Sequence, residues 1–303
     1  MKLTYLKREQ IDTKKWDELV ENNPMVSVSN FSWFLDEIAE NWAAYKAEDQ
    51  DLYFPLPYLK GMKNKMLYQP IFSRVLSILS KPGVETYEFV QALRKQIPID
   101  FKHYIFHSDF AMNADSKERV YQKIEGVKNL ESIQNGYSTN AKRQIKKYPL
   151  EEIEVLVNSN ISDSVDLMKR ELGRKIPELK DDQFRILDQL VKKARKLNGG
   201  FVINLCNNPE IRATGFFIKK KENLIFLKGA AKEDEMKKGA MYALMNETFK
   251  QVEGKINTID FDGSNIPSVA EFYKRLGGKD FTYFENSNSP KIPIQYKIIK
   301  KLF

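Results

Sequence analysis

Two carboxylates and a phenol near the C-terminus form the most reactive grouping in this sequence. Asp260 and Asp262 stand two residues apart in the strand-like run 257–262, so a strand would direct both side chains to one side. The run 266–276 has helical apolar spacing and places Tyr273 on its apolar stripe. A carboxylate held beside such a helix can act as the general base for an attacking amine, and we expect this role for Asp262.

Each of these residues also has a structural alternative. Asp262 could cap the helix that follows it, although Ser264 and Asn265 are better placed for capping by position. Tyr273 could be a core aromatic that packs on the sheet. The sequence leaves both alternatives open.

A second candidate is the basic segment 138–147, which contains no acidic residue. In a helix its cations fall on adjacent i,i+4 rows and form one basic face. Such a face can neutralise several phosphates, or it can simply be a solvated surface. The cations of this predicted anion-binding face are Lys142, Arg143, Lys146 and Lys147.

Composition excludes several other chemistries. Cys206 is the single cysteine, and His103 and His107 are the only histidines, so cysteine-cluster and three-histidine metal sites are excluded and no metal is expected. The chain has 303 residues and a net charge of +8, which favours an anionic partner or serves solubility alone. No run reaches the roughly 18 apolar residues of a membrane span, and the N-terminus lacks a signal-peptide core, so we expect a cytoplasmic protein.

The two halves of the chain share an order of predicted elements: helix, meandering strands, helix, strand. This order predicts a tandem α/β protein with a degenerate module at 1–125 and a second module at 126–303, each a mixed sheet flanked by helices. Prolines in the runs 52–59 and 65–72 predict edge or broken strands. The other predicted helices are 31–42, 84–96, 138–147, 163–172, 182–198, 238–252 and 266–276, and the other strands are 43–47, 101–106, 152–157, 201–205, 211–219, 224–229, 257–262 and 280–285.

The second module resembles the GNAT N-acyltransferase fold. GNAT enzymes commonly carry Asn, Ala, Tyr and Leu-Gly across the strand–helix–strand unit that corresponds to residues 262–278. The matching positions here are Asn265, Ala270, Tyr273, Leu276 and Gly277. In GNAT enzymes the matching tyrosine often protonates the leaving thiolate of coenzyme A, so the resemblance implies this role for Tyr273.

GNAT enzymes also bind the coenzyme A pyrophosphate at a glycine-rich loop that opens a helix. The corresponding residues here are Lys237, Lys238, Gly239 and Ala240, and the acidic run 233–235 precedes them. A tandem layout with such a degenerate loop resembles the FemAB/CelD-like subgroup. FemAB-type enzymes transfer amino acids from aminoacyl-tRNA to peptidoglycan precursors.

The resemblance implies an N-acyltransferase in which an amine acceptor attacks the acyl donor directly within a ternary complex. The donor would be acyl-coenzyme A, as a co-substrate that is not permanently bound, or aminoacyl-tRNA. Its cleft would lie between the strands 224–229 and 257–262, open near Gly229, Ala230 and Asp262. The alternative functions are a catalytically degenerate GNAT-like protein that binds an anionic partner and an aminoacyl-tRNA-dependent aminoacyltransferase of the peptidoglycan type.

Overall fold

A computed structural model of the chain describes residues 1–61, 64–159, 161–175, 180–263 and 266–288. The chain forms two compact units: Met1–Arg119 together with the chain from Thr282 onward, and Val120–Phe281. The strands β6 (Lys117–Glu125) and β12 (Lys279–Ser287) contribute residues to both units. The division into domains at 1–125 and 126–303 stays a prediction. That prediction did not include the return of the chain to the first unit at Thr282.

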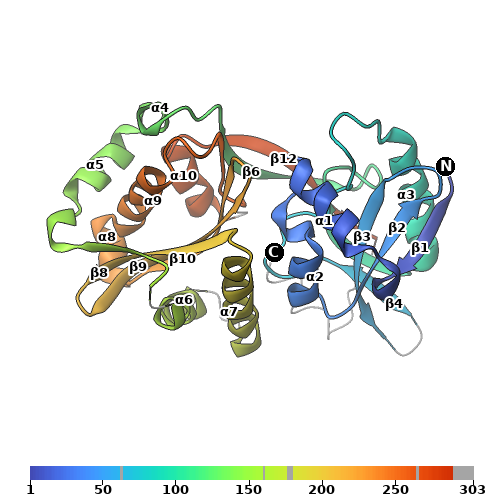
Figure 1. Ribbon diagram of the computed structural model, residues 1–303, viewed down its shortest axis with the longest axis horizontal. Coiled ribbons are helices and arrows are strands. Elements are labelled where there is room, and N and C mark those ends of the chain that lie inside the picture. Colours follow the sequence, from blue (N-terminus) through green and yellow to red (C-terminus); the bar gives the residue numbers. More distant parts are fainter. Residues whose placement is uncertain (62–63, 160, 176–179, 264–265, 289–303) are drawn as a thin grey trace. The chain divides into compact units, whose positions relative to one another are not determined.

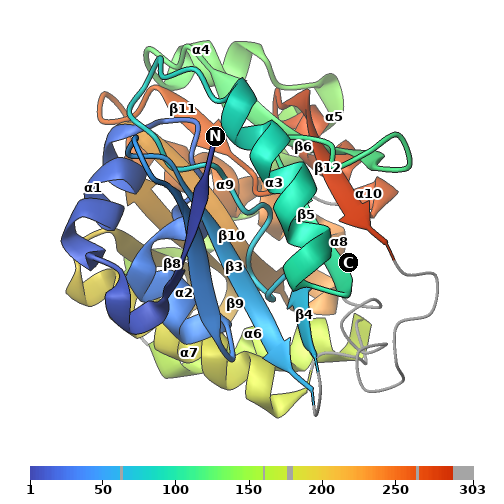
Figure 2. The ribbon, with the colours of Figure 1, turned by 90° about the vertical axis from the view of Figure 1, so that its right-hand side faces the viewer.

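The first unit is a mixed sheet with helices on both faces. Its strand order is β1-β2-β3-β4-β5-β12, and every pair is antiparallel except β4–β5. Helix α3 packs on one face, whereas Trp16 of α1 contacts Trp42 and Tyr53, whose side chains lie on the other face (Figure 2). The elements are β1 (Leu3–Lys7), α1 (Thr13–Asn22), α2 (Ser32–Ile38), β2 (Trp42–Ala47), β3 (Tyr53–Lys60), β4 (Lys65–Tyr68), α3 (Tyr87–Asp100) and β5 (His103–Ser108), with 3₁₀ turns at Arg8–Gln10 and Val28–Asn30.

The second unit contains the strand order β6-β11-β10-β9-β8-β7, in which only β10–β11 is parallel among the described pairs. Helices α5, α9 and α10 cover one face and α6 and α7 the other (Figure 1). Its elements are α4 (Leu130–Asn135), α5 (Thr139–Lys147), a 3₁₀ turn (Leu150–Glu152), β7 (Glu154–Val157), α6 (Ile161–Lys175), α7 (Asp181–Lys196), β8 (Gly200–Asn207), β9 (Glu210–Lys220), β10 (Asn223–Ala231), α8 (Glu233–Lys238), α9 (Ala240–Gln251), β11 (Thr258–Asp260) and α10 (Pro267–Arg275).

Local sequence explains the core of the second unit. Apolar residues recur along β8, β9 and β10, and the face toward α9 carries the buried side chains of Leu205, Ala213 and Ala231. Small side chains on that face allow Ala240, at the start of α9, to lie directly on the sheet. The prediction of an α/β class with mixed sheets flanked by helices is confirmed.

Three local predictions need correction. The helix predicted at 31–42 ends at Ile38, and Trp42 already opens β2. The helix predicted at 238–252 begins at Ala240 as α9, because Gly239 adopts φ +104° and separates it from α8, a helix that the sequence did not predict. The runs 52–59 and 65–72, predicted as edge or broken strands, are not at an edge, because β3 lies between β2 and β4 and β4 lies between β3 and β5. Strand β4 ends at Tyr68, before Pro70, and pairs with β3 through Tyr58–Lys60, so the prolines of β3 fall outside that ladder.

Candidate active site

The parallel pairing of β10 with β11 ends partway along β10. Their register runs from Asn223↔Thr258 to Ile225↔Asp260, where β11 ends, while β10 continues to Ala231. A bulge in β10 between Phe226 and Lys228 follows immediately after the last paired position. A bulge redirects the strand that carries it, and this one lies where the pairing of β10 with β11 has ended.

Three charged side chains collect at this separation. Lys228 is half-buried on β10, and burial lowers its pKa, whereas the neighbouring charge of Asp262 opposes that shift. Asp260 and Asp262 are half-buried at the end of β11, and the backbone N–H of Asp262 donates to Asp260 Oδ1 over 2.8 Å. Asp262 also adopts φ +55°, so the chain turns sharply here.

Tyr273 reaches the same place from α10. Its side chain is 7% exposed, and its ring stacks on Phe261 with 4.7 Å between the centroids and 15° between the planes. Burial, together with the charges of Asp262 and Asp260, raises the pKa of Tyr273 above its usual range. The phenol therefore keeps its proton at neutral pH.

The surroundings of Tyr273 also fit its structural alternative. Its ring belongs to the core that α9 and α10 form on one face of the sheet, with the Phe226 ring 6.3 Å away. Ile266, predicted on the same stripe, is exposed at the N-cap of α10. Ser264 and Asn265 lie outside the described residues. The ring is thus part of the core, while the charges of Asp260 and Asp262 act on its phenol.

Gly229 and Ala230 lie on β10 beyond the point of separation, where they pair with Gly215 and Thr214 of β9. A Cβ at Gly229 would lie 2.7 Å from the Phe226 ring and 2.9 Å from the Thr214 carbonyl oxygen. Glycine is needed here because the Phe226 ring packs directly on the backbone of β10.

The residues expected to form the pyrophosphate loop lie at the junction of α8 and α9. Lys237 Nζ pairs with Glu233 Oε1 and Lys238 Nζ pairs with Glu235 Oε1, each over 2.9 Å. The backbone N–H of Gly239 donates to the Met236 carbonyl oxygen. The acidic run that precedes the lysines is therefore helical and compensates their charge.

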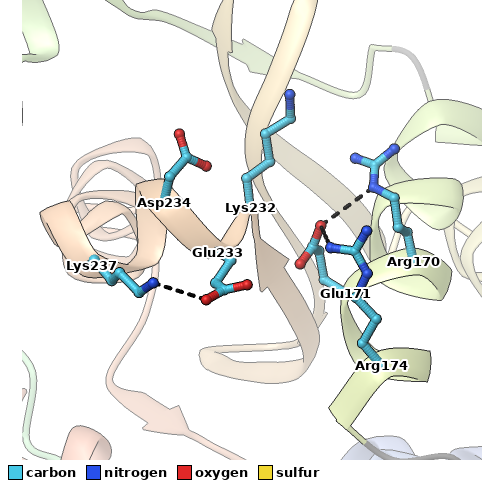
Figure 3. A pocket seen from close by; sticks show the side chains of 7 residues that line it. All are labelled: Arg170, Glu171, Arg174, Lys232, Glu233, Asp234 and Lys237. Carbon is cyan, nitrogen blue, oxygen red and sulfur yellow. Dashed lines mark hydrogen bonds and ion pairs between the residues drawn. The ribbon is translucent and has the colours of Figure 1, made fainter.

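A surface hollow of about 490 Å³ adjoins α8 on its α6 side, and Figure 3 shows the side chains that line it. Glu171, whose side chain is 5% exposed, accepts from Arg170 Nε over 3.3 Å and lies 3.6 Å from Arg174 Nη1. Lys232 pairs with Glu210. Cations and acids alternate around this hollow, so its net field is weak. Its lining is Arg170, Glu171, Arg174, Lys232, Glu233, Asp234 and Lys237.

The predicted basic helix forms as α5, within one residue of the predicted bounds. Ala141 packs into the core beneath α9, and all four cations are exposed. Arg143 Nη2 donates to Asn140 Oδ1 over 2.8 Å. The geometry of a basic face is present, and its role in anion binding stays a prediction. The four cations are Lys142, Arg143, Lys146 and Lys147.

Sequence reasoning did not find Lys228. The available signal was a lysine that interrupts the apolar run 224–231, but only the pairing of β10 with β11 shows that its neighbour is Asp262. Within the described residues, no cluster of three or more potential metal ligands occurs. In the same part of the chain, no helix is long and apolar enough to cross a membrane.

Solved structures share this fold at low sequence identity. FemX superposes with a TM-score of 0.65 and 11% identity over 99% of this chain and 100% of its own. A tandem GNAT protein from the clavulanic acid biosynthesis pathway has a TM-score of 0.51 and 9% identity over 96% of this chain and 100% of its own. L-PGS from Bacillus licheniformis has a TM-score of 0.50 and 12% identity over 91% of this chain and 96% of its own.

No protein-family model and no curated protein matches the sequence. The structural neighbours confirm the predicted GNAT-like, FemAB-type fold. At these identities the likeness shows the fold alone. The reaction therefore has to be argued from the residues of the site.

Proposed function

We propose that the protein is an N-acyltransferase that moves an acyl or aminoacyl group onto an amine at the separation of β10 and β11. The observation that carries this proposal is the separation itself, which begins after Ile225↔Asp260 and has Lys228, Asp262 and Tyr273 around it. An extended donor can bond to the backbone edge that β10 presents beyond Ile225.

The reaction is a direct displacement in a ternary complex. The amine nitrogen attacks the carbonyl carbon of a thioester or aminoacyl ester, so that a C–N bond forms and the C–S or C–O bond breaks. Asp262 accepts the proton that the amine loses, and the Tyr273 phenol gives a proton to the departing sulfur or oxygen. The ammonium of Lys228 stabilises the negative charge that develops on the carbonyl oxygen.

The donor is either acyl-coenzyme A, as a co-substrate, or aminoacyl-tRNA. The ion pairs within α8 disfavour a pyrophosphate at that helix, and this weighs toward an aminoacyl ester. The same observation supports the second candidate function, a non-catalytic protein that binds an anionic partner through the basic face of α5.

Donor binding is tested first, by thermal unfolding with coenzyme A, acetyl-coenzyme A, longer acyl thioesters and aminoacyl-tRNA. A donor at 100 times its dissociation constant stabilises the protein by about 2.7 kcal/mol. Transfer is then measured by mass spectrometry in a mixture of amino acids, aminosugars and polyamines. Amide formation by the wild-type protein, lost in Lys228→Met and in Asp262→Asn, supports the proposal. Binding without amide formation from any donor contradicts it and favours the binding protein.

A further inference from the structure

A second hollow, of about 600 Å³, lies where α7 ends, β8 begins and β9 ends. Gly200 at the start of β8 pairs with Ile218 of β9, and Lys219 pairs with Leu224 at the start of β10. The residues of β9 that pair with Gly229 and Ala230 are Gly215 and Thr214, in the middle of that strand, and they do not line the hollow. The hollow is therefore separate from the proposed acyl-transfer site and belongs wholly to the second unit.

Gly200 allows α7 and the start of β8 to meet at this hollow. A Cβ at Gly200 would lie 2.5 Å from the Cβ of Ala194 in α7, so only glycine lets the strand start against the helix. The backbone N–H of Lys219 donates to the Gly199 carbonyl oxygen over 2.6 Å. This close approach brings the last turn of α7 next to Lys219.

The lining of the hollow contains four cations and no acidic residue. Lys192 is compensated by Asp188 over 2.6 Å. Arg195 Nη2 makes a long contact of 3.5 Å with the Asn158 carbonyl oxygen. Across the described parts of the chain, Arg195, Lys196 and Lys219 form no ion pair with an acidic side chain.

Cations at the end of a helix can be explained by the helix dipole, because they interact favourably with the last carbonyl groups. That explanation covers the three cations of α7, but Lys219 comes from β9 and is half-buried. Cations gathered from two elements repel one another unless an anion joins them. The hollow contrasts with the one beside α8, where each lysine or arginine of the lining has an acidic partner.

We propose that this hollow binds the phosphate group of a phosphorylated ligand. The planar guanidinium of Arg195 suits two phosphate oxygens at once, and Lys196 and Lys219 supply point charges beside it. The side-chain amide of Asn198 adds a further donor at the rim. Phe201, whose ring stacks on Phe217 with centroids 5.4 Å apart, gives the hollow an apolar wall for the remainder of the ligand.

The phosphate can come from a soluble compound or from a lipid headgroup, and the experiment separates the two. Binding of pyrophosphate is measured by calorimetry, and binding to vesicles of phosphatidylglycerol and phosphatidylcholine by sedimentation. The double variant Lys196→Gln/Lys219→Gln is expected to bind pyrophosphate or the anionic vesicles at least tenfold more weakly than the wild type. The matched control Lys128→Gln/Lys255→Gln removes two exposed lysines of the same unit and leaves affinity within twofold.

The proposal is supported when pyrophosphate, anionic vesicles or both bind and the double variant alone loses that affinity. It is overturned when neither probe binds, or when the control loses as much affinity as the double variant. Urea unfolding of each variant shows whether it is folded. Arg195→Gln, a single change in the same lining, provides a second variant and is expected to weaken binding severalfold. None of these variants alters the separation of β10 and β11, so a failure here leaves the acyl-transfer proposal intact.

Discussion

Each unit contains a parallel strand pair with a helical connection, α3 in the first unit and α8 with α9 in the second, and the two pairs end differently. In the first unit β4 and β5 are in register from Met66↔His103 to Tyr68↔Ile105, and the chain then returns to β5. Leu76 N–H donates to the His107 carbonyl oxygen, and His107 N–H donates to Gln69 Oε1, each over 2.8 Å. In the second unit β10 continues to Ala231 after its pairing with β11 has ended.

This difference separates a closed sheet from an open one. Gln69 is 1% exposed and also donates to Ser73 Oγ, which in turn donates to Ser29 Oγ over 3.0 Å. Buried polar groups that are fully bonded stabilise one arrangement, and here they hold the segment after β4 in place beside β5. In the first unit the segment after β4 thus continues beside β5, whereas among the described residues of the second unit no strand pairing with β10 beyond Ile225 on the side of β11 is found. We therefore expect the acyl transfer in the second unit only.

The largest expected difference between the two units comes from replacing one tyrosine in each of them by phenylalanine. Tyr273→Phe is expected to lower turnover by about 100-fold or more, as the loss of a general acid does, without changing the fold. In the first unit Tyr68 accepts from Glu40 N–H over 3.0 Å, and Tyr68→Phe should cost about 1 kcal/mol of stability with turnover within twofold. Steady-state kinetics and urea unfolding measure both. Equal turnover of Tyr273→Phe and wild type would remove the proposed mechanism.

The sequence predicts those helices whose pattern is contained in neighbouring residues. The amphipathic spacing of 138–147 and 182–198 predicted α5 and α7 because the helical period needs only neighbouring residues. Helix α8 was missed, although Glu233 and Lys237 stand at the i,i+4 spacing that stabilises short helices. A charged hexapeptide resembles a solvated turn, and only its packing identifies it as a helix.

The site was predictable only in part. The prediction of Tyr273 rests on its match to the tyrosine of the GNAT motif, and that of Asp262 on its place next to the helix that carries Tyr273. Lys228 joins them through the pairing of strands that α9 separates, and such long-range register is not encoded in any local pattern. The position of the segment after β4 in the first unit depends likewise on a long-range contact, the hydrogen bond from His107 N–H to Gln69 Oε1, which joins residues 38 positions apart.

A second test uses histidine, which occurs in the first unit only. His107 is 3% exposed and its Nδ1 lies 3.1 Å from the Arg74 carbonyl oxygen; burial lowers the pKa of His107 to about 4. Between about pH 4 and pH 6.5 the unfolded chain binds the extra proton, so stability falls as the pH falls through this window. The full loss attributable to His107 is on the order of 3 kcal/mol.

Urea unfolding from pH 7 to pH 4 measures this loss in the wild type and in His107→Gln. The variant is expected to lose less stability than the wild type over the same window, whatever its stability at pH 7. His103→Gln is the matched control, because His103 is half-buried at the start of β5, and it should keep the wild-type dependence. The same pH dependence in all three proteins would show that the closed end of the first unit does not exclude water from His107.

The smallest expected effects compare two glycines with positive φ, one in each unit. Gly239 has φ +104°, and a Cβ there would lie 2.9 Å from Gln144 Oε1 and 3.0 Å from the Gln144 carbonyl oxygen. Gly83 has φ +78° and no atom within 4 Å of that position among the described residues. Gly83→Ala should therefore cost about 1 kcal/mol of unfolding free energy, from backbone conformation alone. Gly239→Ala adds the contact with α5 and should cost about 2 kcal/mol, measured by urea unfolding. Equal losses of unfolding free energy in the two variants would mean that α5 moves away from residue 239 at little energetic cost. A bound donor group could then move α5 at this junction in the same way.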